Sequence, residues 1–389
     1  MNILGISGAI GWDGNIPYRL GDIGDPWVHG SGATLIMNGE LKNAINEERF
    51  SRIKYDGSYP ELVIQNILDY NKITKNDIDL VVYVCGAPNI SFYLKQIGYI
   101  ETKLKEFFPN CKVEFVSHHM AHTAATYFTS GFDEANILSF DGAGDFELQE
   151  NGEWLVPHLK FSHGKDLILT DLHSEYCDVF PMPGSFGKLY ASYSMMVYKN
   201  KMNLPVNDIT ELLSSNRETY PGKVMGLSAY GDYRNIDLPE WFNLEREKQR
   251  HSNEEWEDCF PRLCNVLWNR NISSEQDMNL NSDDLAAWLQ HQFEKYLLLF
   301  LSNIPESIKH DNLCLGGGSA LNILANSKII EQGIYKNVHV NTAPNDDGLH
   351  FGAAIYMSVE KEQKIILPED VGYLGITYTD EEIDGVLSL

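Results

Sequence analysis

The pattern of apolar and polar stretches along the chain predicts a repeated strand element. Residues 3–9 read I-L-G-I-S-G-A and residues 137–143 read I-L-S-F-D-G-A, so each is an apolar strand that runs into a turn of small residues. Strand-like runs around an Asn-Gly pair follow each copy, at residues 38–39 and 151–152. Asn-Gly between such runs is the strongest short signal for a β-hairpin. Two unrelated hairpins would give the same signal, but the repetition suggests a duplicated α/β fold with a cleft between its halves.

Further apolar runs predict the other elements. Strands are expected at residues 80–85 and 113–116, with helical stretches between them. The clearest helix covers residues 282–301, where Ser282 is expected as the N-cap and an apolar stripe as the buried face. Residues 160–280 carry many aromatic and turn-forming residues, and we expect mixed helices and insertions there. The last residues are expected to form one short helix.

The repeat divides the chain into three parts. We expect a first α/β lobe at residues 1–136, a second α/β lobe with insertions at 137–366, and a C-terminal tail at 367–389. The hydrophobic content of 43% and charged content of 22% are typical of globular proteins. No apolar run approaches the roughly 20 residues of a membrane span, and no signal peptide is visible. The six cysteines lack zinc-ribbon or disulfide-framework spacing, so we expect a cytoplasmic protein without membrane contact.

The charge of the chain argues against one class of function. Its 30 basic and 55 acidic residues give a formal net charge of −25. Proteins that bind nucleic acids without sequence preference do so by neutralising phosphates with basic residues. General nucleic-acid binding is therefore not expected, and the acidity is interpreted as a source of solubility.

A group of histidines is the first candidate for chemistry. Residues 117–128 read S-H-H-M-A-H-T-A-A-T-Y-F, in which Ser117 is a good N-cap and the alanines favour helix. His118 and His122 are four apart and share one helix face, roughly 150° from the apolar arc. That face continues with small residues, so we expect the two imidazoles beside open space. They are either metal ligands or two surface or capping histidines, and metal binding requires further ligands.

Three strand-to-turn junctions contain such candidates. Asp141 follows a strand in D-G-A-G-D, and residues 313–322 read L-C-L-G-G-G-S-A-L-N. Glycines after a strand expose backbone amides to an anion, although they also form plain turns, and no P-loop Gly-Lys-Ser/Thr is present. Residues 338–348 end in N-D-D-G, where Asp346 or Asp347 is a further candidate. Two imidazoles and two carboxylates suit iron, manganese or zinc.

Six separated segments give the chain a specific resemblance. They are E-E-R-F-S-R-I-K (47–54), S-H-H-M-A-H (117–122), F-D-G-A-G-D (140–145), G-K-V-M-G-L-S-A-Y-G (222–231), G-G-G-S-A-L-N-I-L-A-N (316–326) and D-D-G-L-H-F-G-A-A (346–354). In order and spacing the chain resembles the O-carbamoyltransferases of nodulation-factor and antibiotic biosynthesis. Their first domain is related to threonylcarbamoyl-tRNA transferases. The resemblance implies a duplicated ribonuclease-H-like fold of the actin/hexokinase/heat-shock ATPase type.

The resemblance also implies a metal site and a nucleotide site. The family's metal ligands match His118, His122, Asp141 and Asp346, with Fe(II), or manganese or zinc, as the ion, and His119 lies outside the set. The resemblance places Gly316, Gly317 and Gly318 against the nucleotide of carbamoyl-adenylate, and Asn322 against its ribose or base. Lys223 either faces the adenylate or has a surface or packing role.

One candidate base stands in a motif that departs from the family. The family's H-D-x-S-A corresponds here to H-G-S-G-A, so His29 keeps the imidazole that accepts the proton of the acceptor hydroxyl. Gly30 replaces the aspartate, and this departure concerns the positioning of His29 or the choice of acceptor. Glu48, Arg49, Arg52 and Lys54 match a strong family motif without an assigned role.

The implied reaction is transfer of a carbamoyl group from carbamoyl-adenylate to a hydroxyl of a sugar, nucleoside or secondary metabolite. Family members continue into a second domain that makes carbamoyl-adenylate from carbamoyl phosphate and ATP, and the resemblance ends here near residue 383. A separate activating domain or protein is therefore expected as a partner, and the family also implies a homodimer. Three alternatives are a small-molecule kinase or ATPase, a tRNA-threonylcarbamoyl enzyme, and a non-catalytic nucleotide-binding subunit. Paired histidines disfavour the kinase, because Mg²⁺ prefers oxygen ligands.

Overall fold

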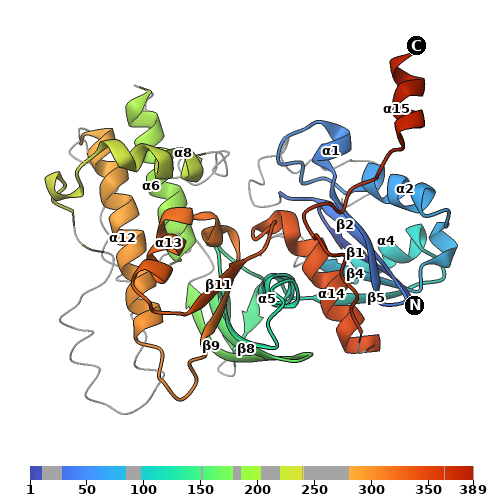
Figure 1. Cartoon of the computed structure of the whole chain (residues 1–389), viewed down its shortest axis with the longest axis horizontal. Helices are drawn as coiled ribbons and strands as arrows, with labels where there is room; N and C mark the ends of the chain where they lie inside the picture. Colours follow the sequence, from blue (N-terminus) through green and yellow to red (C-terminus); the bar gives the residue numbers. More distant parts are fainter. Residues whose placement is uncertain are drawn as a thin grey trace.

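The computed structural model describes residues 1–10, 29–84, 98–149, 152–177, 185–202, 220–238, 240, 280–362 and 364–388. Its described strands form two separate sheets, and helices cover them (Figure 1). The first sheet consists of β1 (Asn2–Ser7), β2 (Gly32–Met37), β3 (Glu40–Asn46), β4 (Leu80–Val84) and β5 (Lys112–Val116). The second consists of β6 (Glu134–Phe140), β7 (Glu147–Leu148), β8 (Trp154–Lys165), β9 (Ile168–Cys177), β10 (Asn312–Gly316) and β11 (Asn337–Val340).

The helices follow the strands in chain order. The α-helices are α1 (Glu48–Ser51), α2 (Glu61–Tyr70), α4 (Tyr99–Phe107), α5 (His118–Phe128), α6 (Phe186–Lys201), α8 (Tyr220–Leu227), α12 (Ser282–Ser302), α13 (Ile323–Glu331), α14 (Leu349–Glu362) and α15 (Asp380–Leu387). The 3₁₀ turns are η2 (Lys75–Asp77), η4 (Ser228–Tyr230), η5 (Tyr233–Asn235), η7 (Gly318–Leu321) and η8 (Asp346–Gly348). None of the described helices is long and apolar enough to cross a membrane.

The two sheets repeat one pairing pattern. In the first, β1 pairs antiparallel with β2 and parallel with β4, and the order is β3-β2-β1-β4-β5. In the second, β6 pairs antiparallel with β8 and parallel with β10, and the order is β11-β10-β6-β8-β7 with β9 beside β8. The central strands β1 and β6 are the two segments whose sequences look alike. The predicted duplication of an α/β fold is confirmed.

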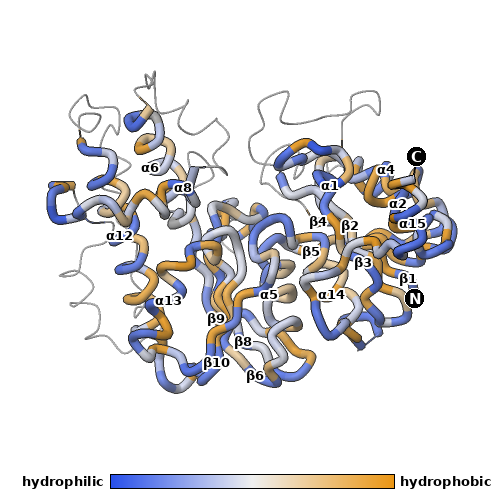
Figure 2. Tube along the Cα trace, turned by 45° about the horizontal axis from the view of Figure 1, so that its top comes forward, coloured by the Kyte–Doolittle hydropathy of each residue, from blue (hydrophilic) through white to orange (hydrophobic). Residues whose placement is uncertain are grey.

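Apolar side chains form a buried core on each face of the first sheet. Leu4 and Ile6 of β1 join a core with α2 and α4, whereas Ile3 joins a core with α5 and α14. Successive side chains of a strand point to opposite faces, so one strand supplies both cores. Apolar residues, orange in Figure 2, accordingly run along the strands of both halves. In the second sheet, Leu138 and Phe140 pack under α6 and α12.

Helix α5 connects the two halves. Its Ala121 and Ala125 lie in the core of the first sheet, and its Tyr127 packs with β6 of the second sheet. The hydroxyl of Thr126 donates to the carbonyl of Leu315 at 3.0 Å, which ties the helix to β10. The histidine-bearing helix therefore has contacts on both sides.

Most predicted elements are present, with two corrections. The strands predicted at 80–85 and 113–116, the paired strands of both hairpins, the helix at 282–301 and the C-terminal helix are found, while Cys85 and Asn151 lie outside the described residues. Asn281, not Ser282, caps α12, because its side chain accepts from the first-turn amides of Asp283 and Asp284. Residues 168–177 were expected among helices and insertions but form β9, which pairs with β8. The polar, mostly half-exposed side chains of β9 hide the strand in the sequence.

The proposed lobe boundaries at 136 and 366 stay a prediction. The chain does not keep its halves separate, because α14 follows the second sheet in sequence but packs on the first. Gly5 of β1 makes this approach close: a Cβ there would lie 2.3 Å from the carbonyl oxygen of His350. The start of α14 is thereby held against β1.

Candidate metal centre

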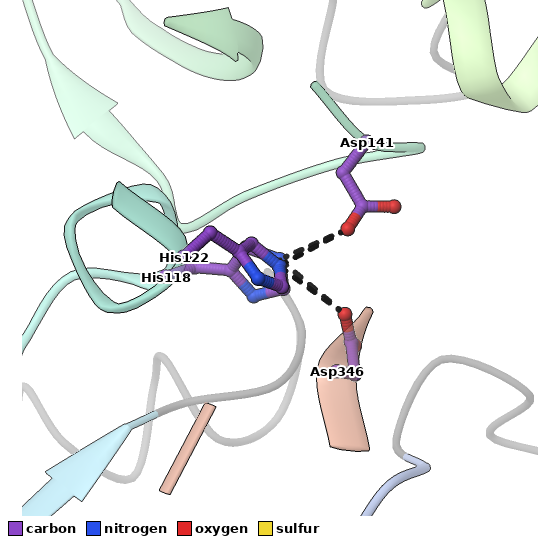
Figure 3. Close-up of side chains that lie close together, drawn as sticks. All are labelled: His118, His122, Asp141 and Asp346. Atoms are coloured by element: carbon purple, nitrogen blue, oxygen red, sulfur yellow. Dashed lines mark hydrogen bonds and ion pairs between the residues drawn. The ribbon is translucent and has the colours of Figure 1, made fainter. Parts of the chain in front are cut away.

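Four side chains from three segments of the chain converge on one point. Each of His118, His122, Asp141 and Asp346 offers one donor atom, and these atoms all lie within 4.8 Å of one another. Figure 3 shows the two imidazoles side by side, with the two carboxylates approaching them from other elements. No other group of this kind is found in the part of the chain that the structure describes.

The paired histidines are positioned by the first turn of α5. The hydroxyl of Ser117 accepts from the amide of Met120 at 3.4 Å, so the helix begins as the sequence predicts. Their spacing of four residues brings the Nε2 atoms of His118 and His122 to 3.1 Å. Both side chains are only 1% exposed, so the expectation that they lie beside open space is wrong. The sequence pattern of α5 did not reveal the tertiary neighbours that cover this face.

Asp141 is fixed by backbone contacts at the end of β6. Its own amide donates to the carbonyl of His158 at 2.8 Å. Its carboxylate accepts from the amides of Gly142 at 2.6 Å and Gly318 at 2.8 Å. One oxygen, Oδ2, still lies 3.2 Å from Nε2 of His122 and 3.6 Å from Nε2 of His118. The strand end and the glycine loop therefore aim this carboxylate at the histidines.

Asp346 reaches the same point from η8, just before α14. Its Oδ1 lies 3.6 Å from the Nε2 atoms of both His118 and His122. Its neighbour Asp347 is not part of the group, since its carboxylate accepts from the side-chain amide of Asn345 at 3.0 Å. Of the two aspartates that the sequence offers here, Asp346 is the one that joins the histidines.

The charges of the group are strongly coupled. Burial alone would lower the pKa of His118, but the carboxylates of Asp346, Asp141 and Asp145 outweigh it and raise that pKa to about 9. Burial would raise the pKa of Asp141, but hydrogen bonds from His118 and His122 hold it well below its usual range. Without an ion, the group is an imidazolium–carboxylate network.

The donor set fits a transition metal. Two imidazole nitrogens and two carboxylate oxygens suit iron, manganese or zinc. Ligands bonded to one ion at about 2.0–2.2 Å lie roughly 3.0–3.4 Å apart, and the separations here of 3.1, 3.2 and 3.6 Å are close to that range. The arrangement needs little adjustment to hold an ion.

The predicted nucleotide residues have different surroundings. Gly317 has φ +88°, and a Cβ there would lie 2.2 Å from the carbonyl oxygen of Phe140, so a glycine is required for the loop to reach Asp141. The side chain of Asn322 exchanges hydrogen bonds with Gln290 at 2.9 and 3.0 Å and caps α13. Lys223 is exposed on α8, with its Nζ 5.9 Å from the ring centres of Tyr198 and Tyr220.

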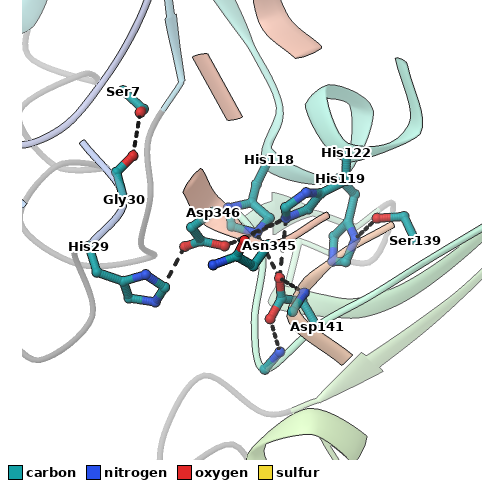
Figure 4. Close-up of polar contacts among 12 residues, drawn as sticks. Ser7, His29, Gly30, His118, His119, His122, Ser139, Asp141, Asn345 and Asp346 are labelled. Atoms are coloured by element: carbon teal, nitrogen blue, oxygen red, sulfur yellow. Dashed lines mark hydrogen bonds and ion pairs between the residues drawn. The ribbon is translucent and has the colours of Figure 1, made fainter. Parts of the chain in front are cut away.

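His29 stands on the opposite side of Asp346. Its Nε2 lies 3.6 Å from Oδ2 of Asp346, and its side chain is 21% exposed (Figure 4). The hydroxyl of Ser7 donates to the carbonyl of Gly30 at 2.9 Å and so anchors this turn. Gly30 has φ +67°, and a Cβ would lie 2.7 Å from the backbone of Asp346 and Asp347. The glycine that departs from the family motif is thus what allows the turn to approach Asp346.

Two other residues clarify the site. His119 is buried, with its Nδ1 2.8 Å from the hydroxyl of Ser139 and its Nε2 3.0 Å from the carbonyl of Pro157, so both nitrogens are used outside the group. Asp145 was missed by the sequence analysis: its buried carboxylate accepts from the backbone amide of His118 at 3.0 Å. The second aspartate of D-G-A-G-D was the available signal for it.

The chain resembles known proteins in sequence. Residues 91–355 match the family model described as Carbamoyltransferase N-terminus. An uncharacterised protein of Synechocystis, sll1178, is 28% identical over 417 residues, covering 93% of this chain and 61% of that protein. The nodulation protein NolNO of Sinorhizobium fredii is 26% identical over 383 residues, covering 93% of this chain and 51% of NolNO. The chain therefore spans between half and two thirds of the length of these relatives.

A solved structure shows the same fold. Full-length HypF, described in a phosphate- and nucleotide-bound form, superposes with a TM-score of 0.50 at 14% identity, over 93% of this chain and 56% of HypF. At such low identity the likeness concerns the fold alone, and it agrees with the predicted duplicated α/β architecture.

Proposed function

The chain belongs to the family described as Carbamoyltransferase N-terminus, and from this premise we propose that it transfers a carbamoyl group from carbamoyl-adenylate to the hydroxyl of a small-molecule acceptor. In this reaction the acceptor oxygen attacks the carbamoyl carbon, and the bond from that carbon to the phosphate oxygen breaks. The electron pair leaves with AMP, and the hydroxyl proton passes to a base. Sugars, nucleosides and secondary metabolites are all acceptors of the required chemistry.

The observation that carries the proposal is the convergence of His118, His122, Asp141 and Asp346 beside the glycine loop. Gly318 donates its amide to Asp141, so the loop is bonded directly to one of the four residues. A ligand with a phosphate next to its reacting carbon can contact both parts at once. The four residues are suited to hold Fe(II), manganese or zinc, which would supply positive charge to the phosphate and the carbamoyl oxygen.

His29 is the proposed base. It is partly exposed, whereas His118, His122 and His119 are buried and engaged, so it is the imidazole near the group that a bound acceptor can reach. The carboxylate of Asp346 beside it stabilises the imidazolium that forms when the hydroxyl loses its proton. Ser7 supports this role by holding the backbone of the next residue, Gly30.

The nucleotide half of the donor is proposed to lie along the glycine loop. Gly316 is the last residue of β10, and Gly317 and Gly318 follow it, so the loop stands at the end of a parallel strand, where ligands bind in folds of this class. Asn322 would contact the ribose or base only after exchanging its bonds to Gln290. Lys223 remains a proposed adenylate contact from α8.

Activation of the carbamoyl group is proposed to occur elsewhere. The relatives are about one and a half to two times as long as the stretch matched here, and the additional part is a source for carbamoyl-adenylate synthesis from carbamoyl phosphate and ATP. A separate activating domain or protein, and a homodimeric assembly, are the partners that this division of labour suggests.

The decisive experiment gives synthetic carbamoyl-adenylate to the purified chain loaded with Fe(II), with and without a panel of hydroxyl acceptors. Acceptor-dependent formation of AMP and a carbamate ester supports the proposal, and H118A/H122A should abolish it. ADP formation from ATP and an acceptor would instead indicate a kinase. Pyrophosphate release from carbamoyl phosphate and ATP by the chain alone would overturn the division of labour. Binding of carbamoyl-adenylate without turnover in any arm would indicate a non-catalytic subunit.

A further inference from the structure

The segment from Glu47 to Ser58 contains a group of basic side chains to which the reaction assigns no role. Arg49, Arg52 and Lys54 are all exposed, and none of them forms an ion pair among the described residues. Some other exposed cations of the described chain are held by carboxylates, as Lys201 is by Asp283 at 2.6 Å, whereas Lys72 and Lys112 form no ion pair among the described residues. What distinguishes the segment is that, in a chain of net charge −25, three cations without an ion pair among the described residues lie within six residues.

The described arginines make the contrast direct. Only three arginines lie in the described part of the chain, at positions 49, 52 and 234. Arg234 makes a close pair with Asp232 at 2.6 Å, whereas Arg49 and Arg52 have no such partner. Among the described residues, the group has one aromatic contact, that of Lys54, whose Nζ lies 4.9 Å from the ring centre of Tyr55. Their charges are therefore available to a ligand.

This segment is held in a defined shape by its own acidic residues. The buried carboxylate of Glu47 accepts from the amides of Leu62 at 3.1 Å and Val63 at 2.9 Å, at the start of α2. The carboxylate of Glu48 accepts from the amide of Tyr55 at 3.0 Å. Both carboxylates therefore bind backbone amides. Arg52 and Tyr55 also adopt left-handed conformations, with φ of +61° and +58°, which residues other than glycine rarely do without a reason.

The basic segment is bonded directly to the turn that carries His29. The amide of Glu47 donates to the carbonyl of Ser31 at 2.8 Å, and the amide of Ser31 donates to the carbonyl of Asp56 at 3.0 Å. On its other side, the side-chain amide of Asn46 donates to the carbonyl of Asp347 at 3.0 Å. The segment thus shares its supports with both the proposed base and the turn of a metal ligand.

We propose that Arg49, Arg52 and Lys54 form an anion-binding rim beside His29, which takes a phosphate- or carboxylate-bearing part of a substrate. Arginine suits this role because its planar guanidinium binds carboxylate and phosphate through two parallel hydrogen bonds. The inference deepens the proposed function and rests on it for the reaction. The anion is either the phosphate of the adenylate donor or an acidic group of the acceptor, because both must meet near His29.

The rim is tested by equilibrium binding to the metal-loaded chain, with AMP against adenosine and glucose 6-phosphate against glucose. We expect R49Q/R52Q to bind the charged member of at least one pair tenfold or more weakly, with the neutral member unaffected, and R49K/R52K to retain part of that binding. Loss confined to AMP assigns the rim to the donor, and loss confined to glucose 6-phosphate assigns it to the acceptor. K105Q/K336Q removes the same charge from elements outside the segment and should bind all four probes normally.

The outcomes separate the rim from the reaction. Equal binding of charged and neutral probes by the unmodified chain, or equal binding of every probe by R49Q/R52Q and the unmodified chain, overturns the rim. Neither result bears on metal stoichiometry or on AMP formation from carbamoyl-adenylate, which test the proposed function. Conversely, if the unmodified chain does not transfer carbamoyl groups but R49Q/R52Q weakens its binding of AMP, the rim is supported and the proposed reaction is contradicted.

Discussion

His29 and Asp346 face each other across 3.6 Å, and the second oxygen of the same carboxylate lies 3.6 Å from each histidine of α5. Asp346 therefore stands between the proposed base and the proposed metal ligands (Figure 4). A carboxylate that contacts both sides can hold the base at a fixed place relative to the proposed metal centre. His29 itself lies outside the group of four donors, so its removal and the removal of the histidine pair should have different effects.

Replacement of His29 by asparagine should slow AMP formation by about 10²- to 10⁴-fold, the usual contribution of a positioned general base. Metal stoichiometry should not change, because His29 lies outside the group of four donors. Rates from carbamoyl-adenylate with a working acceptor, together with metal analysis, check this. H163Q is the control, since His163 of β8 pairs with Glu134 at the start of β6 and is not one of the four donors. Normal transfer by H29N would remove His29 from the reaction.

Metal binding should release a proton from His118. The pKa of about 9 means that the metal-free chain carries this proton at neutral pH, and an imidazole must lose it to bind an ion. Apparent affinity for the metal should therefore rise by about tenfold per pH unit between pH 6 and 8. Calorimetry in buffers of different ionisation enthalpy measures the release, expected at about one proton per ion at pH 7. Metal binding that releases no proton to the buffer would contradict a protonated His118 in the metal-free chain.

Replacement of Gly30 by the aspartate of the family motif should destabilise the protein. A side chain at this position meets the backbone of Asp346 and Asp347, and the positive φ adds strain of about 1 kcal/mol. G30A should lower the free energy of unfolding by about 2–3 kcal/mol, and G30D should also reduce transfer because His29 moves with the turn. Gly131 is the matched control: its φ is +72°, but a Cβ there meets nothing within 4 Å, so G131A carries the strain alone. Equal losses of stability in G30A and G131A would show that the contact is harmless.

His158 should make the protein less stable in mild acid. Burial lowers the pKa of His158 to about 4, and its Nδ1 has no partner among the described residues. The unfolded chain takes up a proton near pH 6.5 while the folded chain does not, so stability is lost as pH falls from 6.5 to 4. The loss from this group is about 3 kcal/mol at most. Denaturant unfolding at pH 7 and 4.5 should show a smaller drop for H158Q than for the unmodified chain, and an unchanged drop for H163Q.

The sequence was sufficient for the repeat but not for the surroundings of the site. The likeness of residues 3–9 and 137–143 predicted two equivalent central strands, because strand periodicity and turn chemistry are local signals. The four ligands were named through a family resemblance, and the structure brings them together. The burial of His118 and His122 and the contact of Asp145 with α5 depend on residues far apart in the chain, and helix periodicity contains no information about them. The strand β9 pairs with its neighbour β8, but its polar, mostly half-exposed side chains give no apolar signal.

The crossing of α5 and α14 should be the most sensitive point of the centre outside its ligands. A Cβ on Gly352 of α14 would lie 1.9 Å from the carbonyl oxygen of Ala121, one residue before His122. G352A must therefore push apart the helix that carries the histidines and the segment that carries Asp346. We expect a loss of about 2–4 kcal/mol in the free energy of unfolding, as for overpacked cores, and at least tenfold weaker metal binding in the folded fraction.

Gly385 supplies the control for this helix contact. It also lies within a helix, α15, but a Cβ there meets nothing within 4 Å, so G385A should be neutral or stabilising by up to about 1 kcal/mol. Chemical denaturation and metal titration of both variants separate helix propensity from the crossing. If G352A keeps full metal affinity despite lower stability, the centre tolerates displacement of α14, and Asp346 is not held by the crossing. If affinity and stability fall together, the close approach of the two helices positions the ligands.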